Sequence, residues 1–307
     1  MTERVRIYEV GPRDGLQNEA VPIATADKRR FIAALLAAGL REIEATSFVR
    51  PDRIPQLADA DELLPSLPRP AGVRYPVLVA NRAGLDRAAK AGADAIAVFT
   101  AATDAFTERN IGMTVDRSLE VFGPLLEEAG TRGWWRRAYV STAFGCPYSG
   151  RVDPARPVDV ARRLLELGAD EVCFGDTIGV ATPRGVTGVT RLALEAGLPV
   201  DRIAHHFHDT RGTAIANVAA ALAQGVRTFD ASTGGTGGCP YAPGAAGNLA
   251  TEDLVYLLDE EGFETGVDLD RLLEAAGLIA SLLGRPLASK VGQAGAWRPE
   301  ADRGASG

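Results

Sequence analysis

All three histidines of the chain, His205, His206 and His208, fall within four consecutive positions. Residues two apart on a β-strand share a face, so His206 and His208 are predicted to point one way and His205 the other. Two imidazoles on one face are typical of a divalent-metal site. The alternative is that one histidine caps a helix and the others are chance neighbours. Their position at the end of a strand-like run favours the metal.

An acidic ligand for such a metal is available in the segment Arg13-Asp14 near the N-terminus. Asp14 is the natural carboxylate ligand, and its alternative role is a cap on the helix that follows. Arg13 is always charged and carries a planar fork of donors, so it suits a carboxylate, a carbonyl or an enolate as it forms. Its alternative role is an ion pair with Glu44 or Asp176, which would not exclude catalysis.

A glycine-rich segment, GGTGGCPYAPGAAG, spans residues 234–247 and contains six glycines. Its one reactive side chain is Cys239, a candidate proton donor or acceptor. The alternative is that Cys239 is a small buried hydrophobe, which is the role we favour for Cys146 and Cys173. Asn248 closes the segment and could supply an amide oxygen as a fourth ligand, or else cap a helix. Two nitrogen and two oxygen ligands suit Mg²⁺, Mn²⁺ or a similar ion.

The elements that must position these residues alternate along the chain. Short strand-like runs are separated by helical segments, and we count eight of them: Val5–Val10, Glu42–Thr46, Tyr75–Ala80, Ala95–Phe99, Ala138–Ala143, Glu171–Phe174, Ile203–His208 and Arg227–Ala231. A glycine follows the end of a helical segment and precedes the next strand at Gly39, Gly92, Gly168 and Gly225. This repeated helix–glycine–strand pattern predicts a parallel sheet built from βα units.

Eight such units predict an α/β protein with one (β/α)8 TIM barrel, whose active site lies at the carboxyl ends of the strands. The alternative is an open doubly wound sheet, but Gly11–Gly15 after the first strand does not fit a dinucleotide-binding turn. Further helices are predicted near 253–258 and 269–283. We therefore expect one domain over 1–292 that includes these C-terminal helices, and a flexible tail over 293–307.

Composition narrows the function classes. The chain has 307 residues, with 33 Lys and Arg against 40 Asp and Glu, so its formal net charge is −7. This balance argues against nucleic acid as a partner. We find neither an apolar run long enough to span a membrane nor a signal peptide. Three cysteines are too few for a disulfide framework and are typical of a cytoplasmic protein.

Several motifs together resemble the hydroxymethylglutaryl-CoA lyase family. The opening Val10–Glu19 segment and the second strand, Ile43–Val49, are similar to that family. So are Gly175–Gly179, His206–Thr210, and the stretch from Gly237 to Asp253 that contains the cysteine loop. The resemblance runs from about Arg6 to Gln293, and the opening motif with the cysteine loop is its most specific part.

The resemblance implies the cleavage of 3-hydroxy-3-methylglutaryl-CoA into acetoacetate and acetyl-CoA, as in leucine degradation. It places Mg²⁺ or Mn²⁺ on Asp14, His206, His208 and Asn248. Asp14, aided by His206, would take the proton of the hydroxyl, Arg13 would stabilise the enolate, and Cys239 would protonate it. The remaining family positions are Glu44, which orients Arg13, the supporting residues Asp176 and Glu252, and the substrate-binding residues Gln17 and Thr177.

Alternatives stay open at this stage. The chain departs from the family at Ala20, Thr103-Asp104, Thr236, Pro243 and Arg211, around the substrate and CoA. The same cleavage on a larger 3-hydroxy-3-alkylglutaryl-CoA is therefore the main alternative, followed by a synthase and by a non-catalytic metal-binding scaffold. An acyl-CoA is the implied partner and a homodimer the implied assembly. No phosphate-binding loop for CoA stands out.

Overall fold

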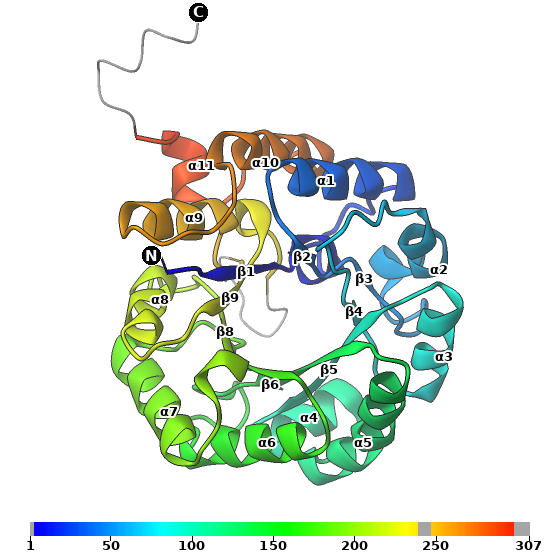
Figure 1. Ribbon diagram of the computed structural model, residues 1–307, viewed down its shortest axis with the longest axis vertical. Coiled ribbons are helices and arrows are strands. Elements are labelled where there is room, and N and C mark those ends of the chain that lie inside the picture. The colour runs from blue at the N-terminus through cyan, green and yellow to red at the C-terminus, as the bar shows by residue number, and fades with distance from the viewer. Residues whose placement is uncertain (1–2, 239–246, 298–307) are drawn as a thin grey trace, which may run out of the picture.

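The computed structural model describes residues 3–238 and 247–297. Nine parallel strands form one sheet in the order β2-β1-β9-β8-β7-β6-β5-β4-β3, and helices surround it (Figure 1). The strands are β1 (Arg6–Glu9), β2 (Glu42–Ile43), β3 (Thr46–Ser47), β4 (Val77–Leu78), β5 (Ala95–Ala101), β6 (Trp135–Ser141), β7 (Glu171–Asp176), β8 (Ile203–Phe207) and β9 (Thr228–Ala231). The predicted TIM barrel is confirmed.

The predicted second strand, 42–46, is divided in the structure. Its first half, β2, pairs with β1, and its second half, β3, pairs with β4. Between them the Glu44 N–H donates to the Glu9 carbonyl at 2.8 Å and the Ala45 N–H to the Pro76 carbonyl at 3.1 Å. These two bonds close the barrel at the point where the strand switches neighbours.

The helices cover the outside of the barrel. They are α1 (Thr25–Ala37), α2 (Ala60–Leu63), α3 (Arg82–Lys90), α4 (Asp104–Ile111), α5 (Val115–Thr131), α6 (Ala155–Glu166), α7 (Pro183–Glu195), α8 (Ala214–Leu222), α9 (Thr251–Glu260), α10 (Leu269–Leu283) and α11 (Lys290–Ala294). Figure 1 shows α9, α10 and α11 grouped beside α1. The predicted C-terminal helices are therefore present, and the predicted start of the tail, residue 293, lies inside α11.

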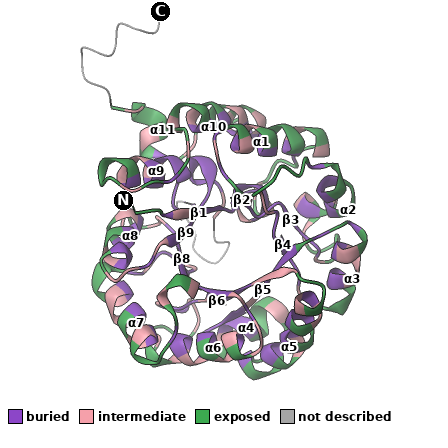
Figure 2. Cartoon of the chain, viewed as in Figure 1, coloured by how far each residue is buried: buried purple, intermediate pink, exposed green. Residues whose placement is uncertain are grey.

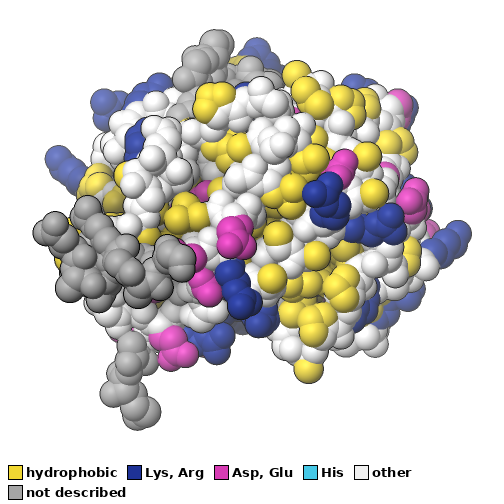
Figure 3. All heavy atoms as spheres, turned by 90° about the horizontal axis from the view of Figure 1, so that it is seen from above, with side chains coloured by type: hydrophobic (Ala, Val, Ile, Leu, Met, Phe, Trp, Pro, Cys, Tyr) yellow, Lys and Arg dark blue, Asp and Glu magenta, His cyan; other side chains and the backbone are white. Residues whose placement is uncertain are grey.

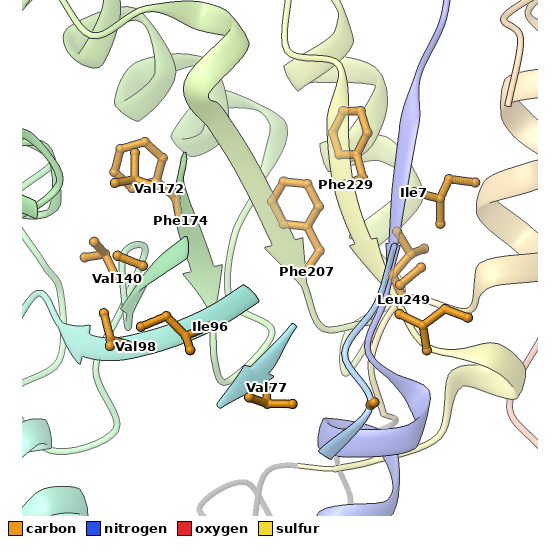
Figure 4. Packing of buried hydrophobic residues seen from close by; sticks show 14 of the residues in the cluster. Ile7, Val77, Ile96, Val98, Val140, Val172, Phe174, Phe207, Phe229 and Leu249 are labelled. Atoms are coloured by element: carbon orange, nitrogen blue, oxygen red, sulfur yellow. The ribbon is translucent and has the colours of Figure 1, made fainter. Parts of the chain in front are cut away.

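The strands sort their side chains into two layers. Outward-pointing residues such as Val140, Phe174 and Phe229 pack against the helices (Figure 4). Inward-pointing residues, among them Tyr8, Tyr139 and Cys173, form a smaller cluster inside the barrel. The strands and the inner faces of the helices are buried, whereas the outer faces of the helices are exposed (Figure 2).

The barrel interior also contains charges. Arg137 on β6 is fully buried, and its Nη2 lies 2.6 Å from Asp230 Oδ1 on β9 and its Nε 2.9 Å from Glu171 Oε1 on β7. The guanidinium carbon lies 3.8 Å from the centre of the Tyr8 ring. Toward the amino ends of the strands, Arg6 pairs with Glu171 and Glu42. The fully buried Arg137 therefore has two carboxylate partners, as burial of charge requires.

The surface differs from this interior. The face shown in Figure 3 mixes basic with acidic side chains, and no histidine is visible on it. All three histidines are buried. In the described part of the chain, no helix combines the length and apolar character needed to cross a bilayer.

The four glycines that punctuate the sequence have left-handed backbones, with φ of +103° at Gly39, +78° at Gly92, +99° at Gly168 and +89° at Gly225. A Cβ added at Gly39 would lie 2.2 Å from the backbone oxygen of Gly266, whereas one added at Gly92 would meet nothing within 4 Å. Both positions disfavour a side chain because of φ, but only Gly39 also has no space for one.

This difference predicts unequal effects of two matched substitutions. Gly92→Ala should lower the free energy of unfolding by about 1 kcal/mol, since only the left-handed backbone resists it. Gly39→Ala should lower it by about 3 kcal/mol because the backbone at Gly266 must also move. Urea unfolding followed by circular dichroism measures both, and equal losses would contradict the steric argument.

Candidate active site

The metal-ligand candidates converge at the carboxyl ends of the strands. His206 and His208 belong to the end of β8, and Asp14 to a helical turn, Gly11–Gly15, that follows β1. One ligand atom from each lies within 4.8 Å of the others. His206 Nε2 and His208 Nε2 are 3.1 Å apart. Two ligands at right angles around an ion with bonds of about 2.1 Å stand about 3 Å apart, so this spacing fits a shared cation.

His205 points the other way, into the layer between strand and helix. Its Nε2 lies 3.0 Å from the hydroxyl of Thr190 on α7, and its ring stacks on Phe207 at 5.2 Å between centroids. The two-residue period of the strand therefore separates one structural histidine from two that face the site.

Asn248 is the candidate for the fourth ligand. Its Nδ2 donates to Asp14 Oδ2 at 2.9 Å and to the Thr236 carbonyl at 3.0 Å. Its Oδ1 is buried and has no hydrogen-bond partner among the described residues. A buried carbonyl oxygen without a partner is costly unless something binds it. Asn248 does not cap α9, which begins at Thr251. The donor set therefore fits a divalent cation.

The protonation states of Asp14 and His208 suit metal binding. Although burial opposes it, the charges of Arg13, His206 and His208 lower the pKa of Asp14 to about 2. Burial, together with the charge of His206, lowers the pKa of His208 to about 3. At neutral pH Asp14 is therefore an anion and His208 is neutral, which are the forms that bind cations.

Arg13 is held between two carboxylates. Its Nη1 donates to Asp14 Oδ1 at 2.5 Å, its Nε donates to Glu44 Oε2 at 2.9 Å, and its Nη2 lies 2.7 Å from the same oxygen. Glu44 lies in the break between β2 and β3 and also accepts a hydrogen bond from the Tyr139 hydroxyl at 3.1 Å. Burial raises the pKa of Glu44. Of the two ion-pair partners considered from the sequence for Arg13, the structure gives Glu44.

Asp230 is a site residue to which the sequence analysis gave no role. Its Oδ2 lies 3.1 Å from His206 Nδ1, and its Oδ1 accepts from Arg137. Although burial opposes it, the hydrogen bond and charge of Asp230 raise the pKa of His206. A carboxylate on the far nitrogen of a metal-binding histidine fixes its orientation and tautomer. The signal was Arg137 at an inward position of β6, which was missed because that strand was predicted to begin at 138.

Asp176 and Glu252 accept hydrogen bonds from backbone N–H groups. Asp176 accepts from the Val180 and Ala181 N–H groups at 2.8 and 3.0 Å, so it closes the turn after β7. Glu252 accepts from the Gly234 N–H with both oxygens at 2.9 Å, at the start of the glycine-rich segment. Neither belongs to the described metal-ligand group.

One cavity of about 930 Å³ connects these residues. Arg13, Asp14, His206 and His208 line it, as do Gln17 and Thr177. Thr177 Oγ1 accepts from the Thr142 N–H at 2.8 Å. The substrate-binding residues implied by the resemblance, Arg13, Gln17 and Thr177, therefore all line the same cavity as the metal-ligand candidates.

Cys239 lies outside the described residues, but the chain on both sides of it is placed. Gly238 lines the cavity, and its carbonyl accepts from Asn18 Nδ2 at 2.8 Å. A Cβ added at Gly237 would lie 2.8 Å from Asn248 Nδ2, and one at Gly247 would lie 2.2 Å from the Gly237 carbonyl oxygen. The segment that carries Cys239 therefore leaves and rejoins the barrel beside Asn248.

Comparison with known proteins identifies the family of the chain. The model of the HMGL-like family matches residues 4–279. The chain belongs to the HMGL-like family. The resemblance found in the motifs is thus confirmed over most of the chain.

Curated relatives in the HMGL-like family cover nearly the whole chain. A hydroxymethylglutaryl-CoA lyase of Pseudomonas mevalonii is 50% identical over 292 residues, which cover 95% of this chain and 97% of the relative. A 3-hydroxy-3-isohexenylglutaryl-CoA/hydroxymethylglutaryl-CoA lyase of Pseudomonas aeruginosa is 46% identical, with 96% and 98% covered. A solved HMG-CoA lyase from Acinetobacter baumannii, in complex with coenzyme A and 3-methylmalate, is 35% identical. It aligns with a TM-score of 0.91 over 96% of this chain and 97% of that one.

The contact between Asp230 and His206 predicts a loss of metal affinity. Asp230→Asn should weaken Mn²⁺ binding by about 10- to 100-fold, because the amide no longer fixes the His206 ring by charge. Titration calorimetry on the folded variant measures this. Thr190→Val is the matched control, since it removes the partner of His205, and it should lower stability but not affinity. Unchanged Mn²⁺ affinity in Asp230→Asn would refute the positioning role.

The raised pKa of Glu252 predicts that the free energy of unfolding depends on pH. Burial raises its pKa to about 8, against 4.5 for an unperturbed glutamate. Between these values the folded state holds a proton that the unfolded state has lost, so stability falls as pH rises from about 4.5 to 8. Glu252→Gln should flatten that part of the profile of unfolding free energy. Glu260→Gln, at the exposed end of the same helix, should leave the slope as in the parent, and equal slopes in all three proteins would contradict the assignment.

Proposed function

We propose that this chain is a hydroxymethylglutaryl-CoA lyase, a carbon–carbon lyase that splits 3-hydroxy-3-methylglutaryl-CoA into acetoacetate and acetyl-CoA. The observation that carries the proposal is the convergence of Asp14, His206, His208 and Asn248 on one end of a cavity beside Arg13. The 50% identical relative named for this activity supports it over nearly the full length.

The four converging residues would hold Mg²⁺ or Mn²⁺ through the Asp14 carboxylate, the two imidazoles and the Asn248 amide oxygen. When bound there, such a cation supplies Lewis-acid chemistry, which lowers the pKa of an alcohol and neutralises a carboxylate. Asp230 positions His206, and Asn248 Nδ2 positions Asp14.

The chain's own residues then transfer two protons, one at oxygen and one at carbon, and stabilise one charge. Asp14, aided by His206, accepts the proton of the tertiary hydroxyl. With a pKa of about 2 it is a weak base, so it needs an acidified alcohol as its partner. As the alkoxide becomes the ketone of acetoacetate, the bond between the carbinol carbon and the thioester's α-carbon breaks. Its electron pair moves into the enolate of acetyl-CoA.

Arg13 binds the enolate oxygen, because its guanidinium borders the cavity and is held in place by Glu44. Glu44 does not need to touch substrate for this role. Gln17 and Thr177 line the same cavity and would contact the substrate's polar groups. The proposal assigns them to substrate binding.

The enolate must gain a proton at carbon, and we assign this step to Cys239. This assignment is supported by the neighbouring residue Gly238, which lines the cavity. The thiol gives its proton to the enolate carbon and becomes a thiolate, and acetyl-CoA is complete. The proton taken by Asp14 returns to the thiolate through solvent.

One relative favours a second, larger substrate. The 46% identical relative from Pseudomonas aeruginosa is named for both an isohexenyl and a methyl substrate. We therefore propose the larger 3-hydroxy-3-alkylglutaryl-CoA as the alternative substrate, with the same residues in the same roles. We also propose a cytoplasmic location, although mammalian relatives are named as mitochondrial.

The direct test is release of acetoacetate and acetyl-CoA from 3-hydroxy-3-methylglutaryl-CoA, with Mg²⁺ and with a chelator. We expect release that depends on the metal. Cys239→Ala should bind Mn²⁺ as tightly as the parent and lose about 1,000-fold or more in kcat, because it lacks only the proton donor. His206→Ala should lose both metal affinity and turnover.

Cys146→Ala is the matched cysteine control, since Cys146 does not line the cavity, and it should retain parental activity. Full turnover by Cys239→Ala would refute the proton-donor role. Release from an isohexenyl substrate but not from the methyl substrate would select the alternative. No release from either, with intact Mn²⁺ binding, would refute the lyase.

A further inference from the structure

The cavity is larger than the reacting part of the substrate. Its volume of about 930 Å³ is near the upper end of the range for small-molecule sites, about 300–1,000 Å³. The metal-ligand candidates occupy one end. From there it extends past β4 and β5 to the segment after β3, which includes Arg53 and Ile54, and to the end of α4, which includes Arg109 and Ile111.

The wall between the two ends is largely apolar. Leu78 on β4, Phe99 on β5, Ile54, Ile111 and Met113 all line it. Such a wall suits a flexible chain with few charges, which describes the pantetheine arm of an acyl-CoA. The space beyond it must then accept the nucleotide and its phosphates.

The charges that line the cavity are mostly positive, although the whole chain carries −7. Four lining residues are arginines and two are carboxylates: Arg13, Arg50, Arg53, Arg109, Asp14 and Glu108. The local charge is thus opposite to that of the whole molecule. A cleft lined by one sign of charge concentrates ligands of the other sign.

Two of the four arginines already have carboxylate partners. Arg13 is bound by Asp14 and Glu44, and exposed Arg50 donates to both oxygens of Asp52, at 3.0 and 2.6 Å. Arg53 and Arg109 have no ion pair with any carboxylate in residues 3–238 and 247–297. The guanidinium carbon of Arg109 lies instead 4.0 Å from the centre of the Tyr148 ring, which holds it without neutralising it.

We propose that Arg53 and Arg109, which both line the cavity, bind the phosphates of coenzyme A while the thioester reaches the metal-ligand candidates. The assignment rests on the proposed function, because that function supplies an acyl-CoA as ligand. Guanidinium groups donate paired hydrogen bonds to phosphate oxygens, and neither of these must first release an acidic partner. Glu108 also faces the cavity and limits how much negative charge it accepts, so both arginines are needed.

The test compares charge-removing variants on two substrates. Arg53→Gln, Arg109→Gln and the double variant are assayed with 3-hydroxy-3-methylglutaryl-CoA and with the corresponding pantetheine thioester, which has no phosphates. Each single variant should raise KM for the CoA substrate by about fivefold, and the double variant by more, with little change in kcat. On the pantetheine thioester the variants and the parent should differ by less than twofold.

Arg184→Gln is the matched control. Arg184 is exposed at the start of α7, at the same end of the barrel, and does not line the cavity. It removes the same charge and should leave KM unchanged. An equal rise in KM for Arg184→Gln, an unchanged KM in the double variant, or equal losses on both thioesters would each overturn the assignment.

Binding of free coenzyme A, measured by titration calorimetry on the same proteins, separates this inference from the proposed function. If the parent cleaves no acyl-CoA but the double variant binds coenzyme A at least fivefold more weakly, the function fails and the phosphate site stands. If the parent is an active lyase and coenzyme A binds the double variant as tightly as the parent, the function stands and the phosphate site fails.

Discussion

The contact between Asp230 and Arg137 is the interaction on which the interior of the barrel depends. A lone carboxylate at a fully buried position would be very unfavourable, and so would a lone guanidinium. Together they neutralise each other at 2.6 Å and leave Asp230 with a second oxygen for His206. Arg137 is in turn paired with Glu171, which pairs with Arg6. A series of paired charges therefore starts near the amino ends of the strands and ends at the metal-ligand candidates, at the carboxyl ends.

The break between β2 and β3 positions a second carboxylate, Glu44, beside Arg13 at the same end of the barrel. In a regular strand, pairing with a single neighbouring strand would fix the direction of the Glu44 side chain. Instead the chain leaves β1 and joins β4 at this residue, and Glu44 reaches Arg13 and Tyr139. One local irregularity thus both completes the ring of strands and places the carboxylate that orients Arg13. Irregular strand ends near functional sites are common for this reason.

Much of this could be predicted from the sequence because it depends on local periodicity. The glycines before four of the strands indicated the βα repeat, and the two-residue period of β8 separated His205 from His206 and His208. Contacts between residues that are far apart in the sequence could not be predicted. No local pattern links Arg137 to Asp230, because only the closed barrel brings these two residues together. The split of the second strand was missed because neighbours, not residue types, decide it. The role of Cys239 remains a prediction.

The alternation along β8 also constrains how this stretch can change during evolution. His205 fills a slot between Thr190 and Phe207, whereas His206 faces Asp230. A substitution at either position affects one layer. A single inserted or deleted codon between Ile203 and His206 would exchange the two layers, so that the ligand faced the helices and the core residue faced the cavity. Divergence within β8 must therefore proceed by replacement at constant length, while the connecting segments remain free to lengthen or shorten.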